Sequence, residues 1–160
     1  MTIRLAKQNM KFSAAHFTIF SATERERLHG HNFIVEVDLH AHMLGNGLCF
    51  DYGIYKDRVV ALCRELNEWM ILPTQSPHLQ IEDAGEQIIA VFNGQRIPFL
   101  KHDVKLLPIA NATLEEFAAW FLVRLSEDPE ALRAHAIDAI EVRVLSGPGQ
   151  SAGRSARFSR

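Results

Sequence analysis

Alternation of apolar and polar residues in two segments constrains this chain more than any other feature. In residues 32–42 one set of alternate positions is apolar and the other is mostly polar, and residues 10–16 show the same pattern. The apolar set of the longer segment is Phe33, Val35, Val37, Leu39 and Ala41. Successive side chains of a β-strand point to opposite faces, so a period of two indicates a strand with one buried face. We therefore predict two such strands.

Two other segments have helical periodicity. Apolar residues recur at helical spacing over residues 52–70, and Asp51 is the expected N-cap. A second helix should begin at Thr113, in a capping box in which Thr113 caps the helix and Glu116 reaches back. Its expected buried stripe consists of Phe117, Trp120, Phe121 and Leu125.

The remaining segments complete an α+β layout. Residues 78–100 alternate around Asn93-Gly94, which is a strong hairpin-turn signal. Residues 139–144 and 154–158 are expected to form two more strands. The order predicts an antiparallel four-stranded sheet with two helices on one face and an inserted hairpin at about residues 78–100. We expect one domain over residues 1–160, with open sheet edges that favour oligomerisation.

Composition excludes several classes of function. The net charge of −2 provides no basic field for nucleic acid. No apolar run approaches the roughly 20 residues of a membrane span, and the start of the chain lacks a signal-peptide core, so we expect a cytoplasmic protein. Cys49 and Cys63 lack metal or redox spacing. A chain of this size needs no metal to fold, so a metal would serve function.

Three histidines lie where the predicted strands would bring them together. His29 and His31 flank Gly30 and would share one face if the second strand extends back to them. His16 lies on the apolar face of the first strand. Neutral imidazoles suit zinc, and three protein ligands leave a fourth tetrahedral position open for catalysis. The sequence therefore predicts a Zn²⁺ site.

A purely structural interpretation of these histidines stays open. His29 and His31 could be hydrogen-bonded strand residues, and His16 could be a core histidine. Three histidines on one apolar face favour the metal. A second pair with the same spacing, His40 and His42, lies on the predicted polar face, where we expect solvent exposure.

With "FSAAH", "LHGHNF" and "DYGIYK" placed in these segments, the chain resembles the 6-pyruvoyl tetrahydropterin synthase family, which includes the 6-carboxytetrahydropterin synthases. The resemblance rests on an ordered set of motifs: "FSAAH", "LHGHNF", "DYGIYK", "NATLEEFA" and "VRVLSGPGQSA". It implies the tunnelling fold, in which trimers build a barrel from antiparallel hairpins and two trimers form a hexamer. It also implies zinc ligands at His16, His29 and His31, near a subunit interface.

The resemblance further implies a lyase that acts on a reduced pterin, usually 7,8-dihydroneopterin triphosphate. In this family zinc polarises the substrate while protein groups move protons. The usual catalytic cysteine would lie four residues before His29, where this chain has Arg25. One branch of the family uses the pattern Glu-x-Leu-His-Gly-His, which "ERLHGH" matches with Glu26. We expect Glu26 to be the base, with a pKa that burial could raise, and Glu24 is the second choice.

Two further departures concern the proton relay and the pterin anchor. The family's Asp-His pair after the first helix is replaced by Asn67 and Glu68, so Glu68 is a candidate acid or base. His102 and Asp103 could substitute for that pair, although neighbours on a strand point apart.

The family's pterin-binding glutamate is replaced by Ser146, and a hydroxyl cannot match a carboxylate that accepts two parallel bonds. We assign Thr113, Glu115 and Ser146 to substrate binding.

Three hypotheses about function follow. The first is a zinc-dependent lyase for a reduced pterin, with Glu26 as base and a 6-pyruvoyl, 6-carboxy or 6-hydroxymethyl pterin as product. The second is a zinc enzyme of the same fold that acts on another heterocycle, or a zinc hydrolase. The third is a non-catalytic, zinc-stabilised oligomeric binding module. All three involve a homo-oligomer and no nucleic acid or membrane.

Overall fold

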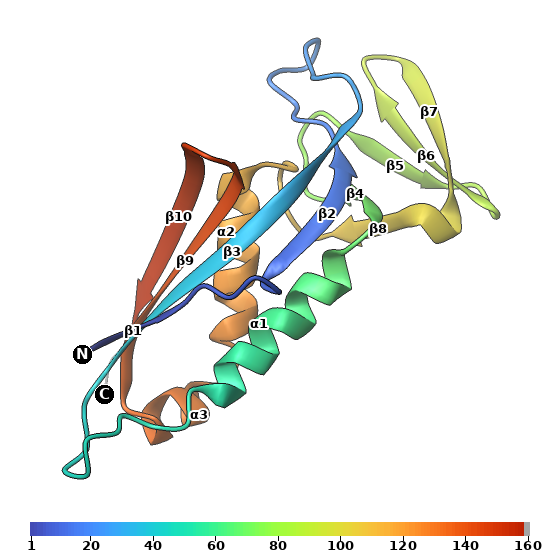
Figure 1. The fold of residues 1–160 in the computed structure, drawn as a ribbon. Helices are drawn as coiled ribbons and strands as arrows, with labels where there is room; N and C mark the ends of the chain where they lie inside the picture. Colours follow the sequence, from blue (N-terminus) through green and yellow to red (C-terminus); the bar gives the residue numbers. More distant parts are fainter. Residues whose placement is uncertain (159–160) are drawn as a thin grey trace.

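A seven-stranded sheet with helices against one face dominates the computed structural model, which describes residues 1–158 (Figure 1). Its strands run in the order β10-β9-β3-β2-β4-β8, and β1 pairs with β3. The strands of this sheet are β1 (Thr2–Leu5), β2 (Lys11–His16), β3 (His29–Ala41), β4 (Trp69–Pro73), β8 (Val104–Leu107), β9 (Ile137–Gly147) and β10 (Gln150–Arg157). The helices are α1 (Gly53–Leu66), α2 (Leu114–Leu125), α3 (Pro129–Ala134) and the 3₁₀ helix η1 (Lys101–Asp103).

The predicted strands correspond to β2, β3, β9 and β10, and they pair antiparallel with one another as expected. The prediction of four strands is wrong in number, because β1, β4 and β8 join the same sheet. β4 runs parallel to both of its neighbours. A strand with parallel neighbours is buried on both faces and therefore lacks alternation, which explains why the sequence pattern did not reveal it.

The first helix is shorter than predicted. The expected helix over residues 52–70 ends at Leu66, and Glu68 has a positive φ of 65° before Trp69 opens β4. Asp51 does not cap the helix at its predicted position, because Tyr52 is the N-cap. The Asp51 carboxylate instead accepts a bond of 2.9 Å from the Gly53 N–H.

The second helix begins as predicted, with one difference in its cap. The Thr113 hydroxyl accepts a bond of 3.4 Å from the Glu116 N–H. The Glu116 carboxylate does not return to Thr113 but accepts a bond of 2.8 Å from the Ala110 N–H. The predicted apolar stripe of the helix is buried. None of the helices in residues 1–158 is long and apolar enough to cross a membrane.

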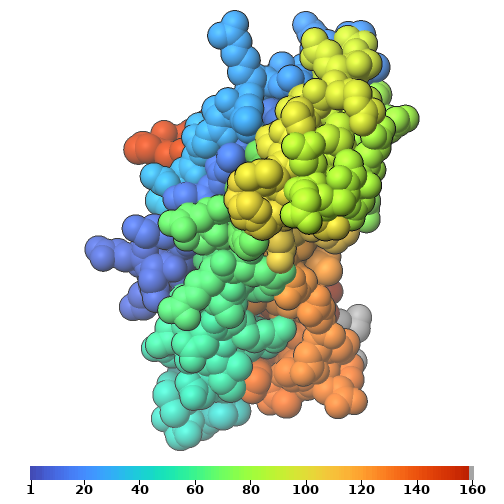
Figure 2. Space-filling model, turned by 90° about the vertical axis from the view of Figure 1, so that its right-hand side faces the viewer, coloured from blue at the N-terminus to red at the C-terminus, as the bar shows by residue number. Residues whose placement is uncertain are grey.

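The inserted segment is a small sheet of three strands instead of a hairpin. Its strands are β5 (Gln80–Asp83), β6 (Gln87–Phe92) and β7 (Gln95–Leu100), in the order β5-β6-β7. Asn93 and Gly94, with φ values of 47° and 74°, form the predicted turn between β6 and β7. Figure 2 shows this green-to-yellow sheet at one end of the molecule, beside blue residues from the early part of the chain.

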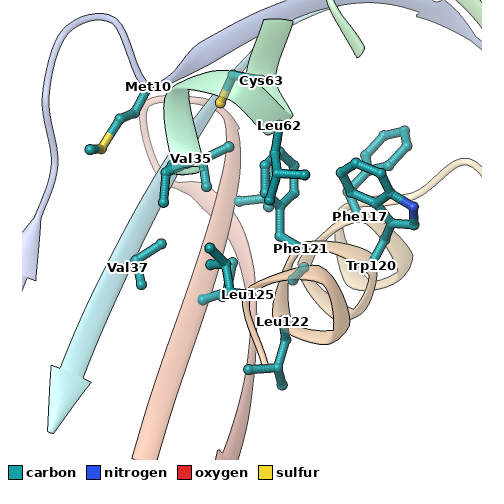
Figure 3. Packing of buried hydrophobic residues seen from close by; sticks show 14 of the residues in the cluster. Met10, Val35, Val37, Leu62, Cys63, Phe117, Trp120, Phe121, Leu122 and Leu125 are labelled. Carbon is teal, nitrogen blue, oxygen red and sulfur yellow. The ribbon is translucent and has the colours of Figure 1, made fainter. Parts of the chain in front are cut away.

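The main core lies between the large sheet and the helices α1 and α2. Figure 3 shows Val35 and Val37 of β3 on the side that faces Phe121 and Leu125 of α2. Phe12 of β2 lies at one end of this core and is 1% exposed. Its ring stacks on Phe33 at 4.9 Å and contacts Phe117 and Phe121 at 5.7 and 5.9 Å. The aromatic contacts join β2, β3 and α2.

We expect Phe12→Ala to lower the free energy of unfolding by about 3–5 kcal/mol, because it removes a buried ring and leaves a cavity. Urea unfolding at one fixed protein concentration measures the difference. Phe20→Ala is the matched control, since the Phe20 side chain is 65% exposed and should cost less than about 0.5 kcal/mol. Equal losses in both variants would contradict this account of the core.

Candidate metal centre and active site

The three predicted histidines converge on one face of the β2–β3 pair. His16, the last residue of β2, lies directly opposite His29, the first residue of β3, and His31 follows on the same face. The ring centroids lie 4.7 Å (His16–His29), 5.4 Å (His16–His31) and 4.9 Å (His29–His31) apart. One nitrogen from each ring lies within 4.8 Å of the other two. The predicted juxtaposition of the rings is confirmed.

Backbone carbonyl groups set the tautomers of two of these rings. His16 Nδ1 lies 2.8 Å from the Ala112 carbonyl oxygen, and His29 Nδ1 lies 2.7 Å from that of Arg27. A carbonyl oxygen only accepts, so each Nδ1 donates, and in the neutral form of each ring the lone pair lies on Nε2. Outer partners of this kind orient metal-binding histidines.

The Nε2 atoms are suited to hold a metal ion. His16 Nε2 is buried and has no hydrogen-bond partner within residues 1–158. The Nε2 atoms of His29 and His31 lie 3.2 Å apart, close to the roughly 3.3 Å edge of a tetrahedral zinc site with bonds of about 2.0–2.1 Å. Burial lowers the pKa of His16, which keeps this ring neutral and able to bind a metal.

A cavity of about 270 Å³ opens in front of the three rings. It brings together the predicted site residues from four regions of the chain, with the exception of Glu68. Those on its wall are His16, Glu26, His29, His31, Thr113, Glu115 and Ser146. The N-terminus of α2 supplies two of them, because the cap residue Thr113 and the first-turn residue Glu115 face the end of β2.

Glu26 lies at the edge of the histidine cluster. Its Oε2 lies 3.8 Å from His29 Nε2, and its side chain is 36% exposed. The Thr18 N–H donates a bond of 3.0 Å to the same oxygen. Burial pushes the pKa of Glu26 upward, but hydrogen bonds from Thr18 and the nearby imidazoles outweigh it and lower the pKa. The expectation that burial would raise this pKa towards neutrality is therefore wrong, and Glu26 is ionised at neutral pH.

Glu68 lies outside this cavity. Its side chain is exposed and borders a second hollow of about 500 Å³ beside the start of β4, which Asp103 also lines. Of the three histidines, only His31 borders this hollow. The catalytic role of Glu68 therefore stays a prediction, because within one chain its side chain does not line the cavity in front of the three histidines.

The other residues near the predicted relay position have structural contacts. The Asn67 side chain accepts a bond of 2.9 Å from the Ser13 N–H. His102 and Asp103 do not point apart, since His102 Nε2 lies 3.2 Å from an Asp103 oxygen. The expectation that the two side chains point apart, as neighbours on a strand do, is wrong because both residues lie in the 3₁₀ helix η1.

Two polar residues on the cavity wall, Thr18 and Gln150, were not predicted as site residues. Gln150 lies across the β9–β10 turn from Ser146, and its Oε1 accepts a bond of 3.1 Å from the Ser146 hydroxyl. Thr18 holds Glu26 as described above. The "SGPGQ" turn signal could have indicated that Ser146 and Gln150 face each other, whereas no local pattern placed Thr18 opposite Glu26.

The second pair of histidines lies apart from the cluster. His40 Nδ1 lies 3.0 Å from the Thr2 hydroxyl, and His42 Nε2 lies 2.6 Å from Asp138. Within residues 1–158, the one group of histidine, cysteine and acidic residues with metal-binding geometry is His16, His29 and His31.

Comparisons with solved structures agree with this geometry. Over 99% of this chain and 98% of the other, the structure matches the crystal structure of 6-pyruvoyl tetrahydropterin synthase from Plasmodium vivax, with a TM-score of 0.93 and 28% identity. A variant of the P. vivax enzyme with a catalytic glutamate replaced by alanine matches equally well.

Sequence comparisons lead to the same family. The chain is 30% identical over 144 residues, 89% of this chain and 88% of the relative, to a Methanocaldococcus jannaschii protein named "Putative 6-carboxy-5,6,7,8-tetrahydropterin synthase". A Pyrococcus horikoshii protein of the same name is 24% identical over 86% of this chain and 81% of its own length. The model of the 6-pyruvoyl tetrahydropterin synthase family matches residues 5–155. This chain therefore belongs to the 6-pyruvoyl tetrahydropterin synthase family.

Proposed function

We propose that this protein is a zinc-dependent lyase that acts on 7,8-dihydroneopterin triphosphate or a related reduced pterin. The observation that carries the proposal is the placement of the Glu26 carboxylate 3.8 Å from His29, at the edge of three converging imidazoles. A metal site beside an ionised carboxylate suits removal of a proton from a carbon next to a substrate oxygen. Family membership supports a pterin as the substrate.

His16, His29 and His31 would hold the zinc ion. The donor set consists of three imidazoles, and the buried Nε2 of His16 requires a partner that a metal would supply. When bound, zinc provides a Lewis acid that polarises the oxygens of the pterin side chain. The carbonyl groups of Ala112 and Arg27 keep two of the rings oriented for this purpose.

Glu26 would act as the general base in place of the family's usual cysteine. Thr18 engages one lone pair of Oε2, and the carboxylate retains further lone pairs for a substrate proton. Its lowered pKa keeps it unprotonated through neutral and mildly acidic pH. The catalytic glutamate of the P. vivax enzyme supports this role for a glutamate on the same fold.

The opposite wall of the cavity would bind the heterocycle. Glu115 offers a carboxylate there, Thr113 a hydroxyl, and Ser146 with Gln150 a pair of neutral polar groups. A glutamate at position 146 could accept two charge-assisted hydrogen bonds from the ring, which the hydroxyl of Ser146 cannot do. This difference favours a second candidate function, in which the same zinc site acts on another heterocycle.

We also propose that the protein forms a homo-oligomer, as a trimer or hexamer. β8 and β10 end the strand order of the large sheet, so one side of each has no partner strand within residues 1–158. Leu106 of β8 and Ile34 of the central strand β3 are large apolar residues that stay exposed in one chain. Edge-to-edge pairing between copies would continue the sheet.

We expect His31→Ala to abolish stoichiometric zinc binding, because it removes one of three ligands. Mutation of a group that only hydrogen-bonds to a metal ligand lowers metal affinity by about 10- to 100-fold. Removal of a ligand itself should therefore lower the zinc affinity by more than about a hundredfold. Equilibrium dialysis followed by elemental analysis measures the zinc bound per chain. His40→Ala, from the second histidine pair, is the control and should bind zinc as the parent does.

Substitution of Glu26 by glutamine should lower kcat by about 10²–10⁴-fold while zinc content stays unchanged, since the amide cannot take a proton. Turnover is measured with dihydroneopterin and with its triphosphate, and mass spectrometry identifies the product. Glu24→Gln, an exposed neighbour outside the cavity, is the control. Unchanged kcat in Glu26→Gln would refute this mechanism, and turnover of neither pterin would favour another heterocycle.

A further inference from the structure

The segment that carries Glu26 is a hairpin of its own between β2 and β3. Ile19 and Arg25 form an antiparallel bridge within it. The Glu26 N–H donates a bond of 2.8 Å to the Thr18 carbonyl oxygen, and the Thr18 N–H donates to the Glu26 carboxylate. The position of Glu26 relative to the histidines therefore depends on what holds residues 17–28 in place.

One side of this hairpin is held from the loop that precedes α2. Asn111 Oδ1 accepts a bond of 3.0 Å from the Ile19 N–H, and Asn111 Nδ2 donates a bond of 2.7 Å to the Ile19 carbonyl oxygen. This reciprocal pair fixes the outgoing arm of the hairpin. Glu26 lies on the other, returning arm.

Arg25 holds the returning arm. Its guanidinium carbon lies 4.9 Å from the ring centroid of Phe17 and 5.7 Å from that of Phe92, the last residue of β6. Its Nη1 donates a bond of 2.8 Å to the Glu26 carbonyl oxygen. The two aromatic rings are 2% and 3% exposed, so the inserted sheet and the hairpin share one small core around this side chain.

Apolar packing alone does not account for an arginine at this position. Its Nε is buried and has no hydrogen-bond partner among the residues that the structure describes, which costs hydration free energy. A methionine would fill the same space without that cost. The feature that only a guanidinium supplies here is the combination of a flat cation on aromatic faces and a directed bond to the Glu26 carbonyl group.

We propose that Arg25 is a positioning residue for Glu26, through which the inserted β5-β6-β7 sheet sets the place of the base beside the histidine cluster. The inference rests on the proposed role of Glu26 as base. Phe92 lies in the inserted sheet and Phe17 follows the ligand His16 directly, so the Arg25 side chain connects the inserted sheet to both the ligand strand and the base. Arg25 itself is not among the residues that line the cavity.

Amide hydrogen exchange of the zinc-free protein tests the holding role without any assay of activity. In Arg25→Met we expect the Thr18 and Glu26 amides to exchange at least about tenfold faster, because local opening becomes easier, while the Val37 amide of β3 keeps its protection. Arg96→Met, which removes an exposed arginine from the same inserted sheet, is the control and should change none of these three amides. Unchanged exchange at Glu26 in a folded Arg25→Met protein would overturn the proposal.

A double-mutant cycle tests whether Arg25 acts through Glu26. Arg25→Met should lower kcat about ten- to a hundredfold with KM within about twofold and zinc content unchanged, because the base is misplaced. In a Glu26→Gln background, measured at high enzyme concentration, the same change should cause no further fall in kcat. Equal losses in both backgrounds would show a general structural role and overturn the proposal.

A conservative variant and the parent protein separate the remaining outcomes. Arg25→Lys keeps the charge and a donor but lacks the flat guanidinium, so its kcat and Glu26 exchange rate should lie between those of the parent and Arg25→Met. This variant also replaces Arg25→Met if the latter does not fold. If the parent turns over no pterin, the proposed function fails, and the exchange experiment still decides whether Arg25 holds the hairpin.

Discussion

The antiparallel register of β2 and β3 is the constraint on which the rest of the candidate site depends. It places His16 opposite His29 and Ala14 opposite His31, so that three imidazoles share one face. A slip of one residue would turn His29 and His31 to the other face, because strand side chains alternate. The aromatic contacts of Phe12 with Phe33, Phe117 and Phe121 oppose such a slip, since they require the apolar face of both strands to meet α2.

The same register explains why the core and the site cannot be separated. Phe33 continues the face that carries the histidines, and its ring lies 5.4 Å from His16 and 5.8 Å from His31. The loop before α2 contributes both the Ala112 carbonyl group that orients His16 and the Asn111 side chain that holds the hairpin. The start of α2 is therefore packed against the strands on one side and forms the cavity wall on the other.

Local patterns predicted those elements whose faces differ in polarity. β2, β3 and α2 were predicted closely because one face of each is buried and the other is solvated. The predicted helix over residues 52–70 includes the first two residues of β4, and the buried apolar run of this strand has no alternation that would indicate a strand. Local patterns are limited in the same way at the site. The H-x-H spacing and the resemblance indicate the histidines and Glu26. The contacts of Thr18 with Glu26 and of Gln150 with Ser146 depend instead on which segments a turn brings together.

The sequence by itself determined the strand faces, the helix start at Thr113 and the three histidines, because each follows from the spacing of neighbouring residues. Only the tertiary structure decided the direction in which the Glu26 pKa shifts and the location of Glu68. The pKa of Glu26 depends on Thr18 and on imidazoles from two strands, and it falls where burial alone would raise it. Glu68 lies after the end of α1 and not within the predicted helix over residues 52–70; the chain turns there into β4, and the Glu68 side chain borders a different hollow. Contacts between distant segments determine both outcomes, and spacing along the chain contains no information about them.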